Sequence, residues 1–300
     1  MEVGDSILSN ICSGLAECEY LKLLFDKVRV INPLKNEIIH IFSKGVNESD
    51  GKCYSIWNKS NMCENCISMR AYNENKVFTK VEYNDNRVFA ITAITMNKGR
   101  EHYVIECIKD ITDSMLINEV SCIAISEICE EIEKLNKLVI TDELTECYNR
   151  RYINERFPLE IKESKRKNEK LTIVLMDIDN FKKINDKYGH QSGDYVLKEI
   201  GKIVKSNIRK EYDWVSRYGG EEFLIVFKNM DTENFIKSTE KIRKSIEEHK
   251  FIYNGVEIKL TASFGVAELS DKIDEMDMLI AEADKKLYKA KELGKNIVII

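Results

Sequence analysis

Proline is scarce in this chain, and long apolar runs are missing. Only two of the 300 residues are proline, and no low-complexity segment or internal repeat is visible. No stretch approaches the roughly 20 apolar residues that a membrane-spanning helix needs. The first residues also lack the basic-then-apolar pattern of a secretory signal. These absences predict a cytoplasmic protein with no membrane partner.

A strong excess of one charge is missing as well. The formal net charge is −5 at pH 7, which argues against a nucleic-acid partner. A locally basic phosphate site remains compatible with that balance. Hydrophobic residues make up 43% of the chain, and 300 residues are enough for two domains with ordinary cores.

Cysteine, in contrast, is plentiful, with nine residues. In a reducing cytoplasm such cysteines are expected to be free thiols rather than structural disulfides. Cys53, Cys63 and Cys66 have the spacing of a metal or redox site, and Cys107 or His40 could supply a fourth ligand. Two interpretations stay open for the three cysteines: a metal or redox site, or small buried side chains that pack under a helix.

The first part of the chain has the pattern of a sheet with a helical insertion. Five short runs are typical of strands, and they are Lys27–Ile31, Glu37–Phe42, Val77–Tyr83, Arg87–Thr95 and His102–Ile108. A loop and helix region over 45–75 separates the second run from the third. This arrangement predicts an α+β domain over residues 1–113.

The segment 114–140 has no glycine or proline and carries apolar residues at mostly three- and four-residue steps. This spacing predicts an amphipathic helix. The helix could pair with its copy in a homodimer, or it could dock within its own chain.

The remaining residues, 141–300, alternate between helical and strand patterns. Helices are predicted over Tyr148–Lys167, Asp194–Ile208, Thr232–His249 and Met276–Leu293. Strands are predicted over Leu171–Met176, Trp214–Tyr218, Phe223–Phe227, Glu257–Ala267 and Ile297–Ile300. We expect the helices to cover one face of a largely antiparallel sheet.

Two carboxylates follow the buried run Leu171–Met176. Asp177 and Asp179 lie two residues apart, so strand periodicity places them on the same face, with Ile178 on the other. Such a pair suits a hard cation such as Mg²⁺. The alternative is a pair of aspartates that cap a helix starting at Phe181.

A second acidic element follows two glycines. Gly219 and Gly220 allow positive φ at both central positions of a hairpin turn. Glu221 and Glu222 then project from the hairpin tip, where their charges repel each other. A metal ion or a proton would relieve that repulsion.

Together these elements closely resemble the diguanylate cyclase (GGDEF) family. The family's substrate-binding segment is similar to Asp177–Asp194, and its signature is similar to Gly219–Phe223, which has the sequence GGEEF. Further landmarks are matched by Thr141–Thr145 with Asn149–Arg151, by Thr261–Gly265, by Ala283–Asp284 and by Tyr288–Asn296. The resemblance covers roughly 160 residues in the right order.

The resemblance implies an enzyme that condenses two GTP molecules into cyclic di-GMP and two pyrophosphates, with Mg²⁺ or Mn²⁺ as cofactor. It implies metal binding by Asp177, the carbonyl of Ile178, and Glu221. Glu221 is also implied as the catalytic base, with Glu222 assisting. The implied substrate-binding residues are Asn185 and Asp194 at the guanine edge, His190 in the same site, and Lys291 and Lys295, one helical turn apart, at the phosphates.

Other activities stay open beside this one. A non-catalytic receptor for GTP or cyclic di-GMP is disfavoured because the implied site residues are intact. A cyclase with relaxed base choice goes with serine at the position of Asp194 in this family, so the aspartate favours guanine. The product-inhibition motif of the family, Arg-x-x-Asp, is replaced by Lys210 to Asp213. Lysine lacks the planar fork of arginine, so weak or absent product inhibition is expected.

The N-terminal region resembles a PAS sensor domain. Its strand order and its ending Asp110–Thr112 carry the resemblance, which covers Leu24–Thr112. The overall prediction is an α+β protein made of a PAS-like sensor over 1–113, a signalling helix over 114–140, and a cyclase domain over 141–300. The sensor would regulate the cyclase.

Overall fold

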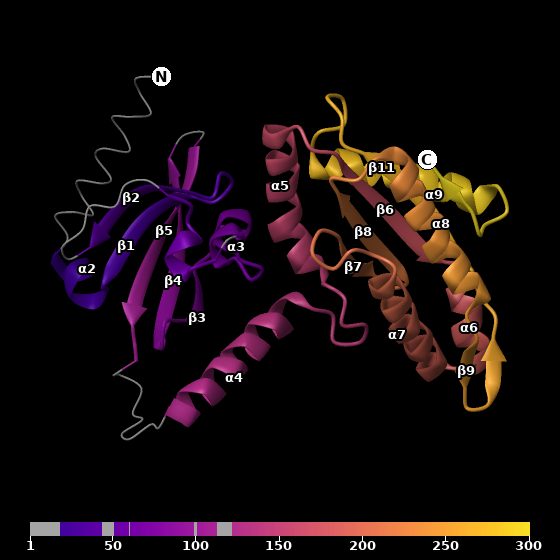
Figure 1. Ribbon diagram of the computed structural model, residues 1–300, viewed down its shortest axis with the longest axis horizontal. Helices are drawn as coiled ribbons and strands as arrows, with labels where there is room; N and C mark the ends of the chain where they lie inside the picture. Colours follow the sequence, from indigo (N-terminus) through magenta and orange to yellow (C-terminus); the bar gives the residue numbers. More distant parts are fainter. Residues whose placement is uncertain (1–18, 44–50, 60, 99–100, 113–121) are drawn as a thin grey trace. The chain divides into compact units, whose positions relative to one another are not determined.

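A computed structural model describes residues 19–43, 51–59, 61–98, 101–112 and 122–300. It divides the chain into two compact units, Met1–Val139 and Ile140–Ile300. Each unit consists of a five-stranded sheet with helices (Figure 1). Of the helices in the described ranges, none is long and apolar enough to cross a membrane.

The sheet of the first unit has the order β2-β1-β5-β4-β3, and every neighbouring pair is antiparallel. The strands are β1 Lys27–Asn32, β2 Glu37–Ser43, β3 Phe78–Asn84, β4 Arg87–Lys98 and β5 Glu101–Asp110. They match the five predicted runs, because alternating apolar residues let each strand bury one face. The helical insertion contains η1 Ser55–Trp57 and α3 Ile67–Glu74, and α2 Glu19–Leu24 precedes β1.

One face of this sheet packs under α3 and η1. Ile67 and Ala71 of α3 and Trp57 of η1 belong to one buried cluster with residues of β1, β4 and β5. The ring of Trp57 meets that of Phe89 edge-on, with centroids 5.6 Å apart. The insertion therefore closes the core of the first unit.

The linker helix α4 is described over Cys122–Ile140, and residues 113–121 of the predicted helix lie outside the described part. Leu135 and Leu138 of this helix are exposed, whereas its last residue, Ile140, is buried. An exposed apolar stripe is what the predicted pairing helix requires.

The sheet of the second unit has the order β12-β11-β6-β8-β7. The strands are β6 Leu171–Ile178, β7 Trp214–Gly219, β8 Glu222–Lys228, β11 Ala262–Glu268 and β12 Val298–Ile299. All pairs are antiparallel except β11 with β12. A separate hairpin is formed by β9 Phe251–Tyr253 and β10 Val256–Ile258.

Helices cover both faces of this second sheet, so the prediction of one covered face is wrong. The helices are α5 Arg150–Lys167, α6 Phe181–Tyr188, α7 His190–Ser206, α8 Thr232–Glu248 and α9 Met276–Glu292. Residues of α6, α7 and α8 share one core cluster with the sheet. On the other face, Trp214 contacts the α5 rings of Tyr152 and Phe157, and Gly265 abuts α9. All eight residues of β6 are buried, as a strand covered on both sides requires.

Two element boundaries also differ from the prediction. The strand predicted over Glu257–Ala267 is two strands, β10 and β11, because the segment leaves the small hairpin before it joins the main sheet. The helix predicted from Asp194 begins earlier, at His190. Its preceding residue, Gly189, has φ +86°, which separates α6 from α7.

Candidate functional site

Two carboxylates face each other across the central strands of the second unit. Asp177 of β6 lies directly opposite Glu222 of β8 in the antiparallel register. The Asp177 side chain is buried, and its Oδ2 accepts from Lys291 Nζ of α9 at 2.9 Å. The fold thus places two acids and one base at one end of the sheet.

The negative charge at this point is only partly balanced. Burial raises the pKa of Asp177, and the charges of Glu221 and Asp179 add to that rise against the lowering effect of Lys291. Burial and the charge of Asp177 likewise raise the pKa of Glu222. The carboxylates therefore repel one another and favour a proton or a cation.

These oxygen donors fit a hard divalent cation. Among the described residues, no three His, Cys, Asp or Glu side chains form a ready ligand group. Mg²⁺ does not require such a cage, because it usually binds through one or two carboxylates together with substrate phosphates and water. Asp177 and Glu221 can supply the carboxylates.

The acidic turn differs in detail from the prediction. Gly219 belongs to β7 and pairs with Glu222, so the two turn residues are Gly220 and Glu221. Only Gly220 has positive φ, at +52°, and a side chain on Gly219 would meet nothing within 4 Å. The tight turn therefore depends on one glycine, and it places Glu221 at the tip.

Arg217 holds this turn, a role that the sequence pattern did not indicate. Its Nε donates to the carbonyl of Gly220 at 2.9 Å, and its Nη1 lies 3.3 Å from both carboxylate oxygens of Asp142. Burial raises the pKa of Asp142, but hydrogen bonds from Thr145 and the charge of Arg217 lower it overall. The segment Thr141–Thr145 is thereby connected to the acidic hairpin. In the sequence, Arg217 is marked only by its place two residues before Gly219, which does not reveal these contacts.

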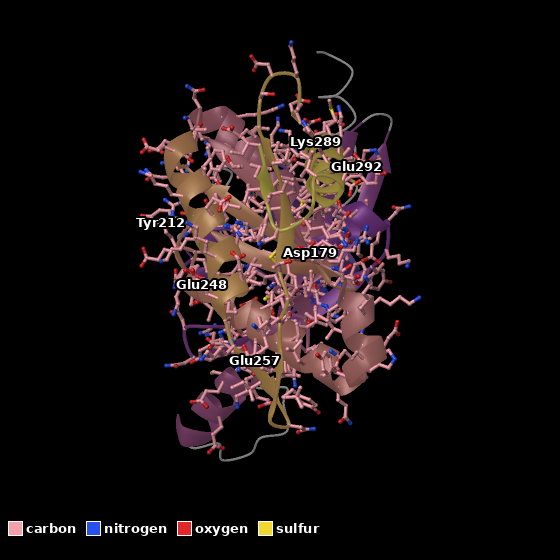
Figure 2. The ribbon with its side chains drawn as sticks, turned by 90° about the vertical axis from the view of Figure 1, so that its right-hand side faces the viewer. Asp179, Tyr212, Glu248, Glu257, Lys289 and Glu292 are labelled. Atoms are coloured by element: carbon pink, nitrogen blue, oxygen red, sulfur yellow. The ribbon has the colours of Figure 1, made fainter. Side chains whose placement is uncertain are left out.

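Asp179 is neither free to bind a cation nor a helix cap. Its carboxylate accepts from Thr261 Oγ1 at 2.6 Å, Ser263 Oγ at 2.7 Å and the backbone N–H of Asn296 at 3.1 Å. In Figure 2, Asp179 lies between the end of α9, where Lys289 and Glu292 are labelled, and Glu257 of β10. The buried side chain therefore joins β11 and the segment after α9 to the start of α6.

Lys291 and Lys295 do not share one helix, so that prediction is wrong. α9 ends at Glu292, and Lys295 follows it in a left-handed conformation with φ +67°. Lys295 Nζ donates to Asn180 Oδ1 at 2.8 Å, next to the first turn of α6. The chain turn that Asp179 holds thus sets the position of Lys295.

Asn185 of α6 lies against α7 in an unusual environment. Its Oδ1 is buried and has no hydrogen-bond partner. A Cβ atom on Gly193 would lie 2.0 Å from this oxygen and 3.1 Å from Cζ of Phe181. Asp194 and His190 are exposed on the same helix as Gly193. An unpaired buried acceptor is rare, and a ligand that donates a hydrogen bond here would satisfy it.

Comparison with known proteins gives this site its context. The family described as "Diguanylate cyclase, GGDEF domain" matches residues 139–297, which is more than half of the chain. This chain belongs to the GGDEF family.

Two similar relatives are named diguanylate cyclases. Diguanylate cyclase A of Treponema denticola is 42% identical over 140 residues, which cover 47% of this chain and 38% of that protein. Diguanylate cyclase DosC of Escherichia coli K12 is 36% identical over 173 residues, which cover 57% of this chain and 37% of that protein. The similarity therefore spans less than two fifths of either relative.

Solved structures agree on the fold of the GGDEF domain. The coiled coil and GGDEF domain of DgcB from Caulobacter crescentus, in complex with c-di-GMP, aligns with a TM-score of 0.54 at 25% identity. The alignment covers 58% of this chain and 92% of that one. Diguanylate cyclase SiaD of Pseudomonas aeruginosa, in complex with its activator SiaC, aligns with a TM-score of 0.53 at 31% identity. It covers 58% of this chain and 66% of SiaD.

In this GGDEF domain the aspartate expected at the product-inhibition site is already engaged. Asp213 is buried, and both its oxygens accept from the Arg209 guanidinium, at 2.8 and 2.7 Å. The backbone N–H of Lys228 donates to it as well, at 3.2 Å. Lys210 is exposed beside this pair. Arg209, which lies one residue before the position of the family's arginine, thus already pairs with the aspartate that a ligand would need.

Outside the GGDEF domain, Cys53, Cys63 and Cys66 are free thiols in the first unit. The described part of the chain gathers no metal-ligand group from them, nor with Cys107 or His40. Burial raises the pKa of Cys66 to about 12, and the neighbouring charge of Cys63 adds to the rise. The metal interpretation therefore lacks support, whereas the thiols are close enough to influence one another.

Proposed function

We propose that the second unit joins two GTP molecules into cyclic di-GMP and releases two pyrophosphates. The observation that carries the proposal is the set of acidic, amide and basic residues at one end of its sheet, within a domain of the GGDEF family. Each half-reaction is attack by a ribose 3′-oxygen on the α-phosphorus of the other GTP. The bond from that phosphorus to the bridging oxygen of the β-phosphate breaks at the same centre.

Asp177, the carbonyl of Ile178, and Glu221 would hold Mg²⁺ or Mn²⁺. The support is the incompletely balanced negative charge between β6 and the hairpin. Burial raises the pKa of Asp177, and the charges of Glu221 and Asp179 add to that rise. When bound, the cation supplies neutralisation of the triphosphate charge. Lys291 would then exchange its contact with Asp177 for the phosphates, and Lys295 would meet them from the turn after α9.

Asn185 and Asp194 would recognise guanine. The unpaired Asn185 Oδ1 can accept a hydrogen bond from the base, and an aspartate can accept from N1–H and the 2-amino group together. Adenine offers no such pair of donors, so the site selects GTP. His190, at the start of α7, would line the same pocket.

Glu221 is the best placed group to take the proton of the 3′-hydroxyl, and Glu222 would assist it. Glu221 lies at the hairpin tip, where an approaching ribose can reach it. General-base catalysis requires the deprotonated carboxylate within hydrogen-bond reach of the hydroxyl. The main contributions of the protein are then positioning and charge neutralisation.

The reaction needs two such domains face to face, since each holds one GTP. A homodimer through the helix over 114–140 would bring them together, supported by the exposed Leu135 and Leu138 of α4. The first unit would be a PAS-like sensor that regulates this meeting in the cytoplasm. Product inhibition at Lys210 would be weak, because Arg209 already engages Asp213.

Incubation of the full chain with GTP and Mg²⁺, followed by mass detection of cyclic di-GMP, tests the proposal. Glu221→Gln should lower the rate by at least about 100-fold because it removes both a metal ligand and the base. Glu257→Gln, an exposed acid on β10, should leave the rate unchanged. Folded wild-type protein that binds GTP but forms no product, in reduced and oxidised states, would instead indicate a receptor.

A further inference from the structure

The Cys-x2-Cys segment of the first unit is built into the start of a helix. Cys66 is the N-cap residue of α3, and its side chain makes no capping hydrogen bond. Cys63 and Cys66 are both half-buried, and Cys63 packs against the apolar cluster around Trp57. A dithiol of this spacing at a helix N-terminus is a common setting for reversible disulfide formation.

The two thiols have different environments. Burial, then the charge of Cys63, keeps Cys66 protonated by raising its pKa to about 12. Both cysteines are half-buried, and because Cys66 keeps its proton, we expect the sulfur of Cys63 to react first. Lys80, a buried lysine, lies nearby: burial lowers its pKa, but the charge of Glu82 and then those of the two cysteines raise it overall. This arrangement gives an attacking sulfur, that of Cys63, and a resolving sulfur, that of Cys66.

Asn65, between the two cysteines, connects the segment to the linker helix. Its Nδ2 donates to Asn136 Oδ1 of α4 at 2.7 Å, and its Oδ1 accepts from Arg70 Nη2 at 2.8 Å. Its carbonyl accepts from Lys80 Nζ at 2.9 Å. Asn65 is only 7% exposed. A displacement of the backbone at Asn65 would therefore act directly on the contact with α4.

Asn136 is well placed to transmit such a change. Its Nδ2 also donates to the carbonyl of Val81 in β3, at 3.3 Å. One helical turn later, the carbonyl of Ile140 accepts from the backbone N–H of Asn149 in the second unit, at 2.9 Å. A single turn of helix thus separates a contact within the first unit from a contact within the second.

We propose that Cys63 and Cys66 are a thiol–disulfide site, oxidised by a low-molecular-weight disulfide, whose state reaches α4 through the Asn65–Asn136 hydrogen bond. The Cys63 thiolate attacks one sulfur of the small disulfide and releases one small thiol. The Cys66 sulfur then loses its proton and attacks the Cys63 sulfur, releasing the second small thiol. Two cysteine thiols are oxidised, and one disulfide is reduced to two thiols. The proposal rests on the proposed cyclase function only where activity is the readout.

Closure of this bridge changes the local backbone. A disulfide requires the two Cα atoms to lie about 4.4–6.8 Å apart with a defined torsion. Residues 64 and 65 then lie within a small ring, and we expect Asn65 to lose at least one of its three partners. Weakening of the Asn65–Asn136 bond frees α4 at the turn that precedes the cyclase unit.

Two readouts that are independent of turnover test this inference. The full chain is treated with oxidised glutathione, and its peptides are mapped by mass. We expect a Cys63–Cys66 bridge, reversed by dithiothreitol, and faster hydrogen exchange of backbone amides over 130–140. Cys63→Ala should abolish both effects, whereas Cys53→Ala, the matched control in the same cluster, should retain them. An unbridged pair, a Cys53–Cys66 bridge, or a bridge without altered exchange overturns the proposal.

Asn136→Ala tests the connection to α4. The bridge should still form in this variant, but exchange over 130–140 should no longer respond to it. Where the reduced wild type makes cyclic di-GMP, oxidation should change its rate by about fivefold or more, and Asn136→Ala should remove that change. A response that persists in Asn136→Ala overturns the connection. Absence of product in every state would count against the cyclase function, while the mass and exchange results would still decide the thiol site.

Discussion

The two units differ in the charged residues that face each other across neighbouring strands. In the first, Arg29 of β1 lies opposite Glu106 of β5, and the two form a buried ion pair at 2.5 Å, with Ser68 also bonded to the glutamate. In the second, Asp177 lies opposite Glu222, and like charges at directly opposite positions destabilise a sheet. The facing pair of the first unit is neutral as a whole, whereas the facing pair of the second leaves negative charge that a cation or a proton can balance. This contrast supports the proposal that the reaction takes place at the end of the second sheet.

Each unit contains one of the two tryptophans, which makes the comparison measurable. Trp57 is buried in the first unit and Trp214 in the second. Trp57→Phe leaves a fluorescent reporter in the second unit, and Trp214→Phe leaves one in the first unit. Urea unfolding of these two backgrounds can follow each unit separately.

Gly265→Ala should have the largest effect, and only on the second unit. A Cβ atom here would lie 2.1 Å from the carbonyl oxygen of Ala283 and 2.3 Å from the backbone nitrogen of Leu287, so α9 must move away. We expect a loss of at least about 3 kcal/mol in unfolding free energy, reported by Trp214. Gly219→Ala, where a Cβ meets nothing within 4 Å, is the stability control. An equal loss reported by Trp57 would mean that the units unfold together.

Glu106→Gln should destabilise the first unit by about 3 kcal/mol, because it leaves the Arg29 guanidinium buried without its counter-charge. Trp57 fluorescence in urea measures this loss. Arg87→Gln, which breaks an exposed pair with Asp110, should cost less than about 1 kcal/mol. A small loss of unfolding free energy in Glu106→Gln would show that other groups in the first unit can balance the buried charge of Arg29.

Ligand binding should stabilise the second unit alone. With Mg²⁺ and a non-hydrolysable GTP analogue at about 100 times its Kd, mass action adds about 2.7 kcal/mol to the unfolding free energy. Trp214 should report this gain while Trp57 reports no change. The analogue without a divalent cation should give a smaller gain. Stabilisation of the first unit instead would place the nucleotide elsewhere in the chain.

Asp179→Asn should have the smallest of the four effects on stability, about 2 kcal/mol, because the amide cannot accept from all three partners. Lys295 depends on the same turn, so KM for GTP should rise more than kcat falls. Asp271→Asn, an exposed loop acid, should change neither constant. An unchanged KM would limit Asp179 to a structural role.

The strands of both sheets were predictable because the spacing of apolar residues along the chain marks them. The five runs of the first unit and the buried run Leu171–Met176 follow from local apolar pattern. The covering of both faces of the second sheet was missed, although the unbroken burial of β6 is a physical sign of it. The split into β10 and β11 depends on pairing partners distant in sequence, which no local pattern contains.

The sequence by itself determined the family, the acidic residues and their order, because a motif of fixed spacing lies within one strand, one turn or one helix. Only the tertiary structure decided their partners. Asp179 is engaged by Thr261, Ser263 and Asn296, Asp213 by Arg209, and Arg217 holds the hairpin turn. The Asn65–Asn136 bond likewise joins residues 71 positions apart. Such contacts depend on how strands and helices meet in space, and side-chain identity alone cannot specify which neighbour each group will find.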